Sequence, residues 1–170
     1  MLRVLLIVPY PELETRVMDI WENHFRSNGL DVDVISATAE ELTKTIHLDA
    51  YDIIIGRGHT AQLLKQINGA YSVVDILITG YDVLRAIEEA RRCHAGKRIA
   101  LFLSAVRNHD AQVLSDVSGL DIRIFVVQDI SEMEATMAYI KEEGYDAVVG
   151  GYSARISAER MGLPAVVIQT

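Results

Sequence analysis

The sequence predicts an α/β protein in which a β-α unit is repeated, and three observations support this prediction. Short runs rich in β-branched residues alternate with amphipathic stretches from one end of the 170-residue chain to the other. The runs are apolar throughout, which is typical of parallel strands that helices cover on both faces. Two sequence motifs also recur at nearly the same spacing. We therefore expect two similar lobes, each built on a parallel sheet.

The first half contains four candidate strands separated by stretches with helical periodicity. Strands are expected at 4–8, 32–35, 53–55 and 73–76, and helices at 13–27, 39–48 and 60–67. In the first helix the apolar residues fall on one stripe and the charged residues mostly face outward. The stripe consists of Val17, Ile20, Trp21 and Phe25, and the charged residues are Glu14, Asp19, Glu22 and Arg26.

The second half repeats the same order of elements. Strands are expected at 99–103, 122–127, 147–149 and 165–168, with helices at 110–117, 132–143 and 153–161. The segment YDIIIG at 51–56 returns as YDAVVG at 145–150, and RVLL at 3–6 returns as RIAL at 98–101. The two offsets are 94 and 95 positions, so a duplicated unit is favoured over a chance match.

This repeat defines the predicted domain boundaries. We expect a first lobe at 1–80, a connecting helix at 81–94 and a second lobe at 95–170. The first lobe is followed by a long helix, whereas the second stops at its last strand. We therefore expect the polypeptide to continue beyond this chain.

Composition limits the class of function. The chain carries 16 Lys and Arg against 24 Asp and Glu, a net charge of −8, and 50% of its residues are hydrophobic. The apolar fraction suffices for a packed core, and the negative charge without a basic cluster disfavours direct contact with nucleic acid. The single cysteine, Cys93, excludes an internal disulfide. No apolar stretch approaches the roughly 20 residues of a membrane span, so a cytoplasmic protein without membrane contact is expected.

Two glycine-containing turns follow equivalent predicted strands. The sequence GRGHTA at 56–61 has the form G-x-G-x-x-A of a dinucleotide fingerprint, but it follows the third strand instead of the first. Two other interpretations are open: the backbone N–H groups form a cradle for a small anion, or the glycines only permit a tight turn. The sequence GGYS at 150–153 occupies the equivalent place in the second half.

Ligands of open parallel sheets bind outside the carboxyl ends of the strands. The turns at 9–10, 56–60, 104–108 and 150–153 all follow predicted strands, and we expect them to face a cleft between the lobes. A further feature is TGYD at 79–82, where capping of a helix accounts for Thr79 and Asp82 but requires neither Gly80 nor Tyr81. The five histidines show no metal-ligand spacing, so no metal site is expected.

Several of these segments resemble one known family. IGRGHTAQLL at 55–64, VVDI at 73–76 and TGYDVLRA at 79–86 are similar to the N-terminal sensor domain of the propionate catabolism activators, which are sigma-54-dependent transcriptional regulators. GKRIA at 96–100 and YDAVVGG at 145–151 continue the resemblance in order, so that it covers most of the chain. The TGYDVL block is its most specific part.

The resemblance implies a fold and a role. It implies an α/β tandem duplication of two three-layer α/β/α lobes with four-stranded parallel sheets, in a chelatase-like arrangement. It also implies a sensor without a cofactor that binds a small anionic metabolite and signals to downstream ATPase and DNA-binding domains of the same polypeptide. For propionate-type members the implied effector is a small tricarboxylate such as methylcitrate. Here the turn at 104–108 reads SAVRN where the family often has glycine or proline, so a different small organic acid is expected.

The predicted ligand-binding residues combine the turns with the resembling block. They are Tyr10, Gly56, Arg57, Gly58, His59, Thr60, Thr79, Gly80, Tyr81, Asp82, Ser104, Arg107, Gly150, Gly151, Tyr152 and Ser153. Two alternatives of another class stay open: a two-lobed racemase-like or chelatase-like enzyme, and an enzyme that binds a nucleotide. A homodimer is compatible with the sequence, which does not indicate the surface it would use.

Overall fold

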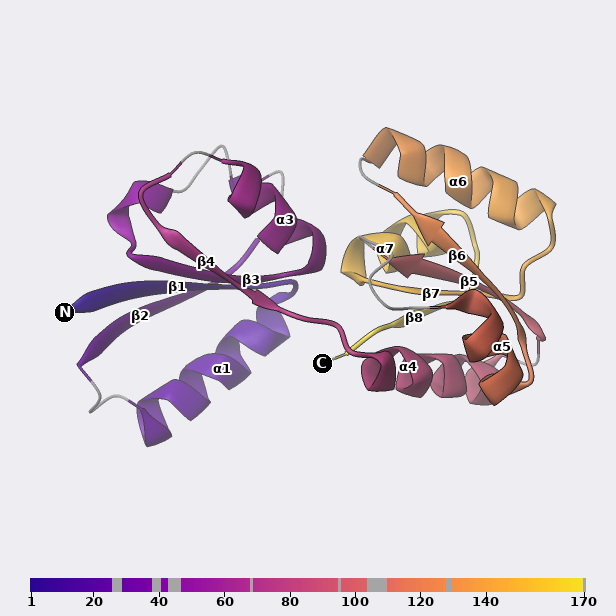
Figure 1. Ribbon diagram of the computed structural model, residues 1–170, viewed down its shortest axis with the longest axis horizontal. Helices are drawn as coiled ribbons and strands as arrows, with labels where there is room; N and C mark the ends of the chain where they lie inside the picture. Colours follow the sequence, from indigo (N-terminus) through magenta and orange to yellow (C-terminus); the bar gives the residue numbers. More distant parts are fainter. Residues whose placement is uncertain are drawn as a thin grey trace. The chain divides into compact units, whose positions relative to one another are not determined.

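Two four-stranded parallel sheets, each alternating with helices, form the protein in the computed structural model (Figure 1). The structure describes residues 1–25, 29–37, 41–42, 47–67, 69–94, 96–103, 110–127 and 130–169. The chain divides into two compact units, Met1–Leu77 and Ile78–Thr170. The predicted fold class, a tandem α/β duplication, is confirmed.

The first unit has the strand order β2-β1-β3-β4. Its elements are β1 (Leu2–Val8), α1 (Pro11–His24), β2 (Leu30–Ser36), the short 3₁₀ helix η1 (Leu48–Ala50), β3 (Ile53–Arg57), α3 (Gly58–Gln66) and β4 (Ser72–Ile76). Most of the helix predicted at 39–48 lies outside the described residues. One face of the sheet packs against α3, with Leu5, Ile54 and Leu64 in its core, and α1 covers the other face (Figure 1).

The second unit has the equivalent order β6-β5-β7-β8. Its elements are α4 (Gly80–Cys93), β5 (Arg98–Leu103), α5 (Ala111–Ser118), β6 (Asp121–Val126), α6 (Ile130–Glu142), β7 (Ala147–Gly150), α7 (Tyr152–Arg160) and β8 (Ala165–Val167). Helices α6 and α7 cover one face of this sheet, and α4 and α5 lie together on the other (Figure 1). Because α4 contacts β7, β8 and α5, it is part of the second unit's core.

The repeated motifs make the same contacts in both units. The carboxylate of Asp52 accepts the backbone N–H of Arg3 at 2.8 Å, and that of Asp146 accepts the N–H of Arg98 at 2.9 Å. Each arginine places its guanidinium over the ring of the tyrosine that precedes the aspartate, at 4.9 and 4.6 Å from the centroid. In each unit these contacts link two neighbouring strands at their amino ends. This shared structural role explains why the Arg and Tyr-Asp motifs recur together.

The apolar stripe of α1 is less deeply buried than its pattern indicates. Ile20 and Phe25 are 46% and 47% exposed, and Val17 and Trp21 are only partly buried. Among the charged residues of this helix, Glu14 is partly buried, and its Oε2 accepts the backbone N–H of Ser36 at 2.9 Å. Periodicity identifies the apolar side of a helix, but how deeply that side is buried depends on the neighbouring elements.

None of the helices in the described ranges is long and apolar enough to cross a membrane. Within the same ranges, no three His, Cys, Asp or Glu side chains are grouped so that they could hold a metal ion. Cys93 is a free, exposed thiol at the end of α4.

Candidate functional site

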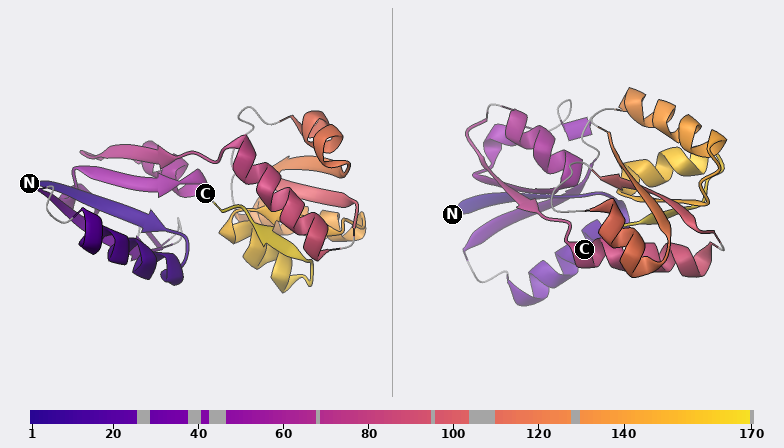
Figure 2. Two further views of the ribbon diagram at one scale, coloured as in Figure 1. Left: turned by 90° about the horizontal axis from the view of Figure 1, so that it is seen from below. Right: turned by 45° about the vertical axis from the view of Figure 1, so that its right-hand side comes forward.

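The carboxyl edge of the first sheet is the candidate site, because several of the predicted residues lie there. Strands β1 and β3 are neighbours, with Leu6 paired to Ile55. The chain leaves β1 for α1 on one face and leaves β3 for α3 on the other (Figure 2). This is the point at which the strand order reverses, and open α/β sheets bind ligands outside the carboxyl ends of the strands there.

The 56–60 turn brings the start of α3 directly to this edge. Gly56 is buried, and a Cβ at this position would lie 3.4 Å from Leu64 Cδ1 and 3.5 Å from the backbone nitrogen of Ala61. Gly58 has φ +54°, the left-handed region that favours glycine, and it is the first residue of α3. The left-handed conformation of Gly58 therefore lets the strand pass into the helix without a connecting loop.

The side chains of this turn differ in exposure. Arg57 is the last residue of β3 and the N-cap of α3, and it is half-buried, as is Thr60. His59 is exposed. Tyr10, the N-cap of α1, follows β1 at the same edge and is half-buried. The structure thus brings Tyr10 and the 56–60 turn to one edge of one sheet.

The helices of the protein differ in how their N-termini are capped. In α4 and α5 a side chain accepts first-turn N–H groups: Thr79 Oγ1 accepts from Asp82 at 3.2 Å, and Asp110 Oδ1 accepts from Gln112 at 2.8 Å. In α1 and α3, which begin at the edge just described, no side-chain cap is formed by the described residues. A helix N-terminus carries unsatisfied donors and partial positive charge, which favour an anion. These two helix ends are therefore suited to a ligand.

The second unit has an equivalent turn at the carboxyl end of β7. Gly151 is the N-cap of α7, which also lacks a side-chain cap among the described residues. Gly150 has a structural role, since a Cβ there would lie 2.9 Å from the Cβ atoms of Phe102 and Ala154. Tyr152 is half-buried and Ser153 is exposed. Ser104 and Arg107, predicted at the end of the neighbouring strand, lie outside the described residues.

The TGYD block begins α4. Asp82 is 9% exposed, and its Oδ2 accepts hydrogen bonds from the backbone N–H of Thr79 at 2.9 Å and from Thr79 Oγ1 at 2.6 Å. Capping thus engages Thr79 and Asp82, whereas Tyr81 is 73% exposed and Gly80 has open space around it. Because Arg85 donates to the carbonyl of Gln169, this end of α4 lies at the carboxyl end of β8. From the sequence alone, the TGYD block was known only to follow the strand predicted at 73–76. Its position beside the end of β8 is known from the structure.

The structure also bears on the dinucleotide interpretation. Asp75 of β4 pairs with Lys65 of α3, with 3.0 Å between Oδ2 and Nζ. Asp75 lies beside Gly56 in the pairing of β3 and β4, and its side chain is 12% exposed, so its carboxylate is held in an ion pair and is mostly buried. Glu14 was named from the sequence, but its carboxylate was not predicted to accept the backbone N–H of Ser36 at the end of β2. The position of Glu14 in the first turn of a helix was the available signal.

The fold defines a two-lobed α/β class of domain with two four-stranded parallel sheets. The chain matches the family model described as "propionate catabolism activator" over residues 27–170. It therefore belongs to that family and corresponds to the N-terminal domain of its sigma-54-dependent transcriptional regulators, which confirms the predicted resemblance. No curated protein sequence matches the chain.

One of three solved structures that resemble this chain agrees with its fold. A crystal structure of an NtrC family transcriptional regulator from Clostridium acetobutylicum superposes with a TM-score of 0.80 at 22% identity, covering 99% of this chain and 88% of that one. The open, ligand-free structure of a substrate-binding protein with adhesive properties from Clostridium difficile gives 0.37 at 11% identity, covering 98% and 73%. A periplasmic solute-binding protein from Actinobacillus succinogenes 130z with bound D-allose gives 0.41 at 13%, covering 98% and 76%. The last two likenesses are too weak to bear on function.

Proposed function

We propose that this domain is a sensor that binds a small organic acid at the carboxyl edge of its first sheet. The observation that carries the proposal is the start of α3, whose first-turn N–H groups lack a side-chain cap among the described residues and lie beside Arg57 at the point where the strand order reverses. A carboxylate placed there would accept hydrogen bonds from backbone N–H groups and lie near a guanidinium.

The size of the ligand follows from the surroundings of the turn. Gly56 packs against α3, and the helix begins two residues later without a long phosphate-binding loop. The carboxylate of Asp75 forms an ion pair with Lys65. A dinucleotide requires a longer groove with an acid for the ribose. These features favour a compact anion, such as a di- or tricarboxylate, over a nucleotide.

The domain's output is proposed to be conformational and not catalytic. As part of a sigma-54-dependent regulator, it would pass ligand occupancy to the downstream ATPase and DNA-binding domains. A ligand shifts such an equilibrium only by its difference in affinity for the two states, and a tenfold difference corresponds to about 1.4 kcal/mol. The predicted contacts in the second unit, at 79–82, 104–107 and 150–153, stay predictions.

The test is a thermal-shift screen of the domain against di- and tricarboxylates, phosphorylated metabolites, NAD and ATP. A ligand at about 100 times its dissociation constant adds roughly 2.7 kcal/mol to stability, which is a measurable rise in Tm. Arg57→Ala is expected to remove the shift given by an organic acid, and each shift is measured from the variant's own Tm without ligand. Arg16→Ala is the matched control, because it removes the same charge from an exposed position on α1.

Three results would contradict the proposal. An unaltered affinity in Arg57→Ala would remove the 56–60 turn from the site. A shift with NAD or ATP alone would favour the nucleotide-binding alternative. Turnover of an amino acid or a metalloporphyrin precursor by the domain would favour the racemase-like or chelatase-like enzyme.

A further inference from the structure

The two units differ in one charged contact near the carboxyl edge of their sheets. In the first unit, the register of β3 and β4 places Asp75 opposite Gly56. In the second unit, the register of β7 and β8 places Val167 opposite Gly150. Because Gly56 and Gly150 end the two copies of the repeated Tyr-Asp motif, Asp75 and Val167 are counterparts. An acid therefore lies where the duplicated fold has a valine.

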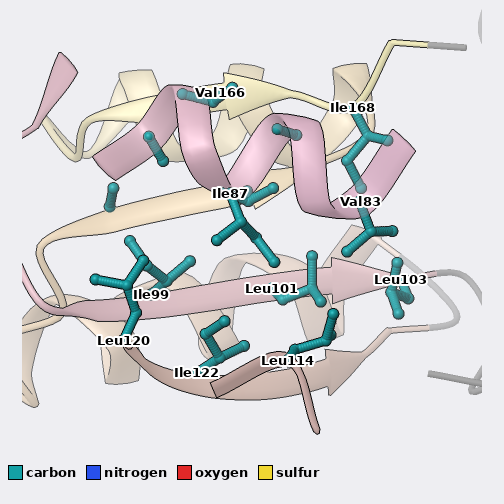
Figure 3. Close-up of a cluster of buried hydrophobic side chains, with 14 residues drawn as sticks. Val83, Ile87, Ile99, Leu101, Leu103, Leu114, Leu120, Ile122, Val166 and Ile168 are labelled. Atoms are coloured by element: carbon teal, nitrogen blue, oxygen red, sulfur yellow. The ribbon is translucent and has the colours of Figure 1, made fainter. Parts of the chain in front are cut away.

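The valine shows that the fold accepts an apolar side chain at this position. Strand β8 is apolar on both faces. Val166 and Ile168 pack in one core with α4 (Figure 3), and Val167 points to the opposite face, which α7 covers. At the equivalent place in β4, Asp75 brings a carboxylate to the face covered by α3, and its side chain is only 12% exposed. A carboxylate buried in this way loses its hydration and requires a partner.

A lysine of α3 supplies a partner for this carboxylate. The Nζ atom of Lys65 lies 3.0 Å from Oδ2 of Asp75, and the side chain of Lys65 is 43% exposed. The pair thus presents its ammonium group, more than its carboxylate, to solvent. Helices α3 and α7 have the same length, so that Glu159 is the counterpart of Lys65, and Glu159 instead pairs with Arg155 of its own helix at 2.6 Å. The pair between helix and strand is therefore a property of the first unit.

The ammonium group of Lys65 lies near the start of α3. Its partner Asp75 is paired with Gly56, two residues before the first residue of α3, and neighbouring strands are about 4.8 Å apart. Side chains of a helix lean toward its N-terminus, which lets Lys65 reach back from the last turn of α3. The first turn of α3, which has no side-chain cap among the described residues, and this ammonium group are thus two positive groups on one face of the sheet, near its carboxyl edge.

We propose that Lys65 belongs to the ligand site and binds a second carboxylate of the ligand, while Asp75 holds the ammonium group in place. This inference rests on the proposed function and narrows the ligand to an acid with at least two carboxylates. One carboxylate would bind at the first turn of α3, and the other would accept a hydrogen bond from Lys65 Nζ. Replacing a buried ion pair by apolar residues of similar size is often neutral or stabilising, and Val167 fills the equivalent position. A role in binding accounts for a charged pair where an apolar residue suffices for the fold.

The test gives the first unit the apolar residue of the second. The double variant Lys65→Met with Asp75→Val removes both charges and keeps apolar volume at both positions. Binding is measured by thermal shift with acids of matched length, succinate against butyrate and glutarate against pentanoate. The unchanged chain 1–170 should bind each dicarboxylate at least about tenfold more tightly than its monocarboxylate, because the second carboxylate adds a charge-assisted hydrogen bond.

The double variant should lose the preference for dicarboxylates and keep or raise its Tm without ligand. Lys65→Arg retains a cation at this position and should retain the preference. Lys65→Gln removes the charge but can still donate to Asp75, so it tests the same point if the double variant is poorly folded. Arg155→Met with Glu159→Gln is the matched control, because it removes an ion pair from the equivalent helix of the second unit.

Three results would overturn the inference. An unaltered preference in the double variant and in Lys65→Gln would remove Lys65 from the site. A lower Tm with unaltered binding would mean that the ion pair only stabilises the fold. Failure of the unchanged chain to prefer dicarboxylates would mean that a second carboxylate is not recognised. The proposed function is tested separately, because it depends on whether an organic acid binds at all and whether Arg57→Ala removes that binding.

Discussion

The adjacent glycines of β7 and α7 allow a sharp test of the second unit, because they look alike in sequence and differ in structure. A Cβ on Gly150 would lie 2.9 Å from the Cβ atoms of Phe102 and Ala154. That is about 0.6–1.1 Å less than the usual separation of about 3.5–4.0 Å between carbon atoms in contact. Both neighbours are fixed to backbone, in β5 and in α7, so neither can rotate away. Gly151 has φ −71°, and a Cβ at that position would have no other atom within 4 Å.

The expected magnitudes follow from these contacts. Overpacking of this kind costs about 1–3 kcal/mol in Gly150→Ala, because the helix and the sheet must move apart. Replacing glycine by alanine also lowers the entropy of the unfolded chain, by about 0.4–1 kcal/mol, but this contribution is common to both variants. In Gly151→Ala it is offset by the poorer N-cap, roughly 0.5 kcal/mol. Gly150→Ala should therefore be about 1–2 kcal/mol less stable than Gly151→Ala.

Urea unfolding measures this difference. With a slope of about 1–3 kcal/mol per molar urea, the midpoints followed by far-ultraviolet circular dichroism should differ by roughly 0.5–1 M. The single tryptophan, Trp21, lies in the first unit and supplies an internal control, since its fluorescence transition should not distinguish the two variants. Equal midpoints, or a lower midpoint for Gly151→Ala, would refute the close-approach argument for Gly150.

Three further predictions concern the contacts of single side chains. Asp146→Ala should lower the free energy of unfolding by about 1 kcal/mol more than Asp52→Ala, measured by urea unfolding, because Asp146 accepts two backbone N–H groups and Asp52 accepts one. Tyr71→Phe should raise the urea midpoint, since the buried Tyr71 hydroxyl has no hydrogen-bond partner among the described residues; a lower midpoint would contradict this. Burial and the hydrogen bond to Asp33 raise the pKa of Tyr51 from its ordinary value of 10.0. The unfolded chain then loses its proton first, so stability should fall as pH rises above about 10, and Tyr51→Phe should reduce that fall in midpoints measured from pH 9 to 11.

Local patterns were enough to predict the architecture. The apolar runs became parallel strands because such composition is typical of strands buried on both faces. The repeated Tyr-Asp and Arg motifs predicted a duplication, and the reason is the contact they form: each aspartate accepts the N–H of the arginine on the neighbouring strand. The edge position of the 56–60 turn was also predictable, since a turn that follows a parallel strand must lie at the carboxyl edge.

Other features depended on what packs beside each residue. The sequence identified the apolar stripe of α1, but Ile20 and Phe25 are exposed. Burial requires a neighbouring element that packs against the stripe, and periodicity does not show which element that is. Gly150 and Gly151 have the same sequence context, and only the approach of β5 and α7 separates them. Capping of α4 by Thr79 and Asp82, and the absence of a side-chain cap on α3 among the described residues, likewise became visible only with coordinates.

Which elements form, and that they form twice, could be read from the chain alone, because periodicity, turn residues and repeats are local properties. The sheet that each helix packs against could not be read from the chain alone. Helix α4 follows the first sheet and packs on the second, and Val74 and Ile76 stay accessible although their pattern is that of a core strand. Packing between elements distant in sequence sets these outcomes, since the free energy of burial depends on the surface a side chain meets and not on its neighbours along the chain.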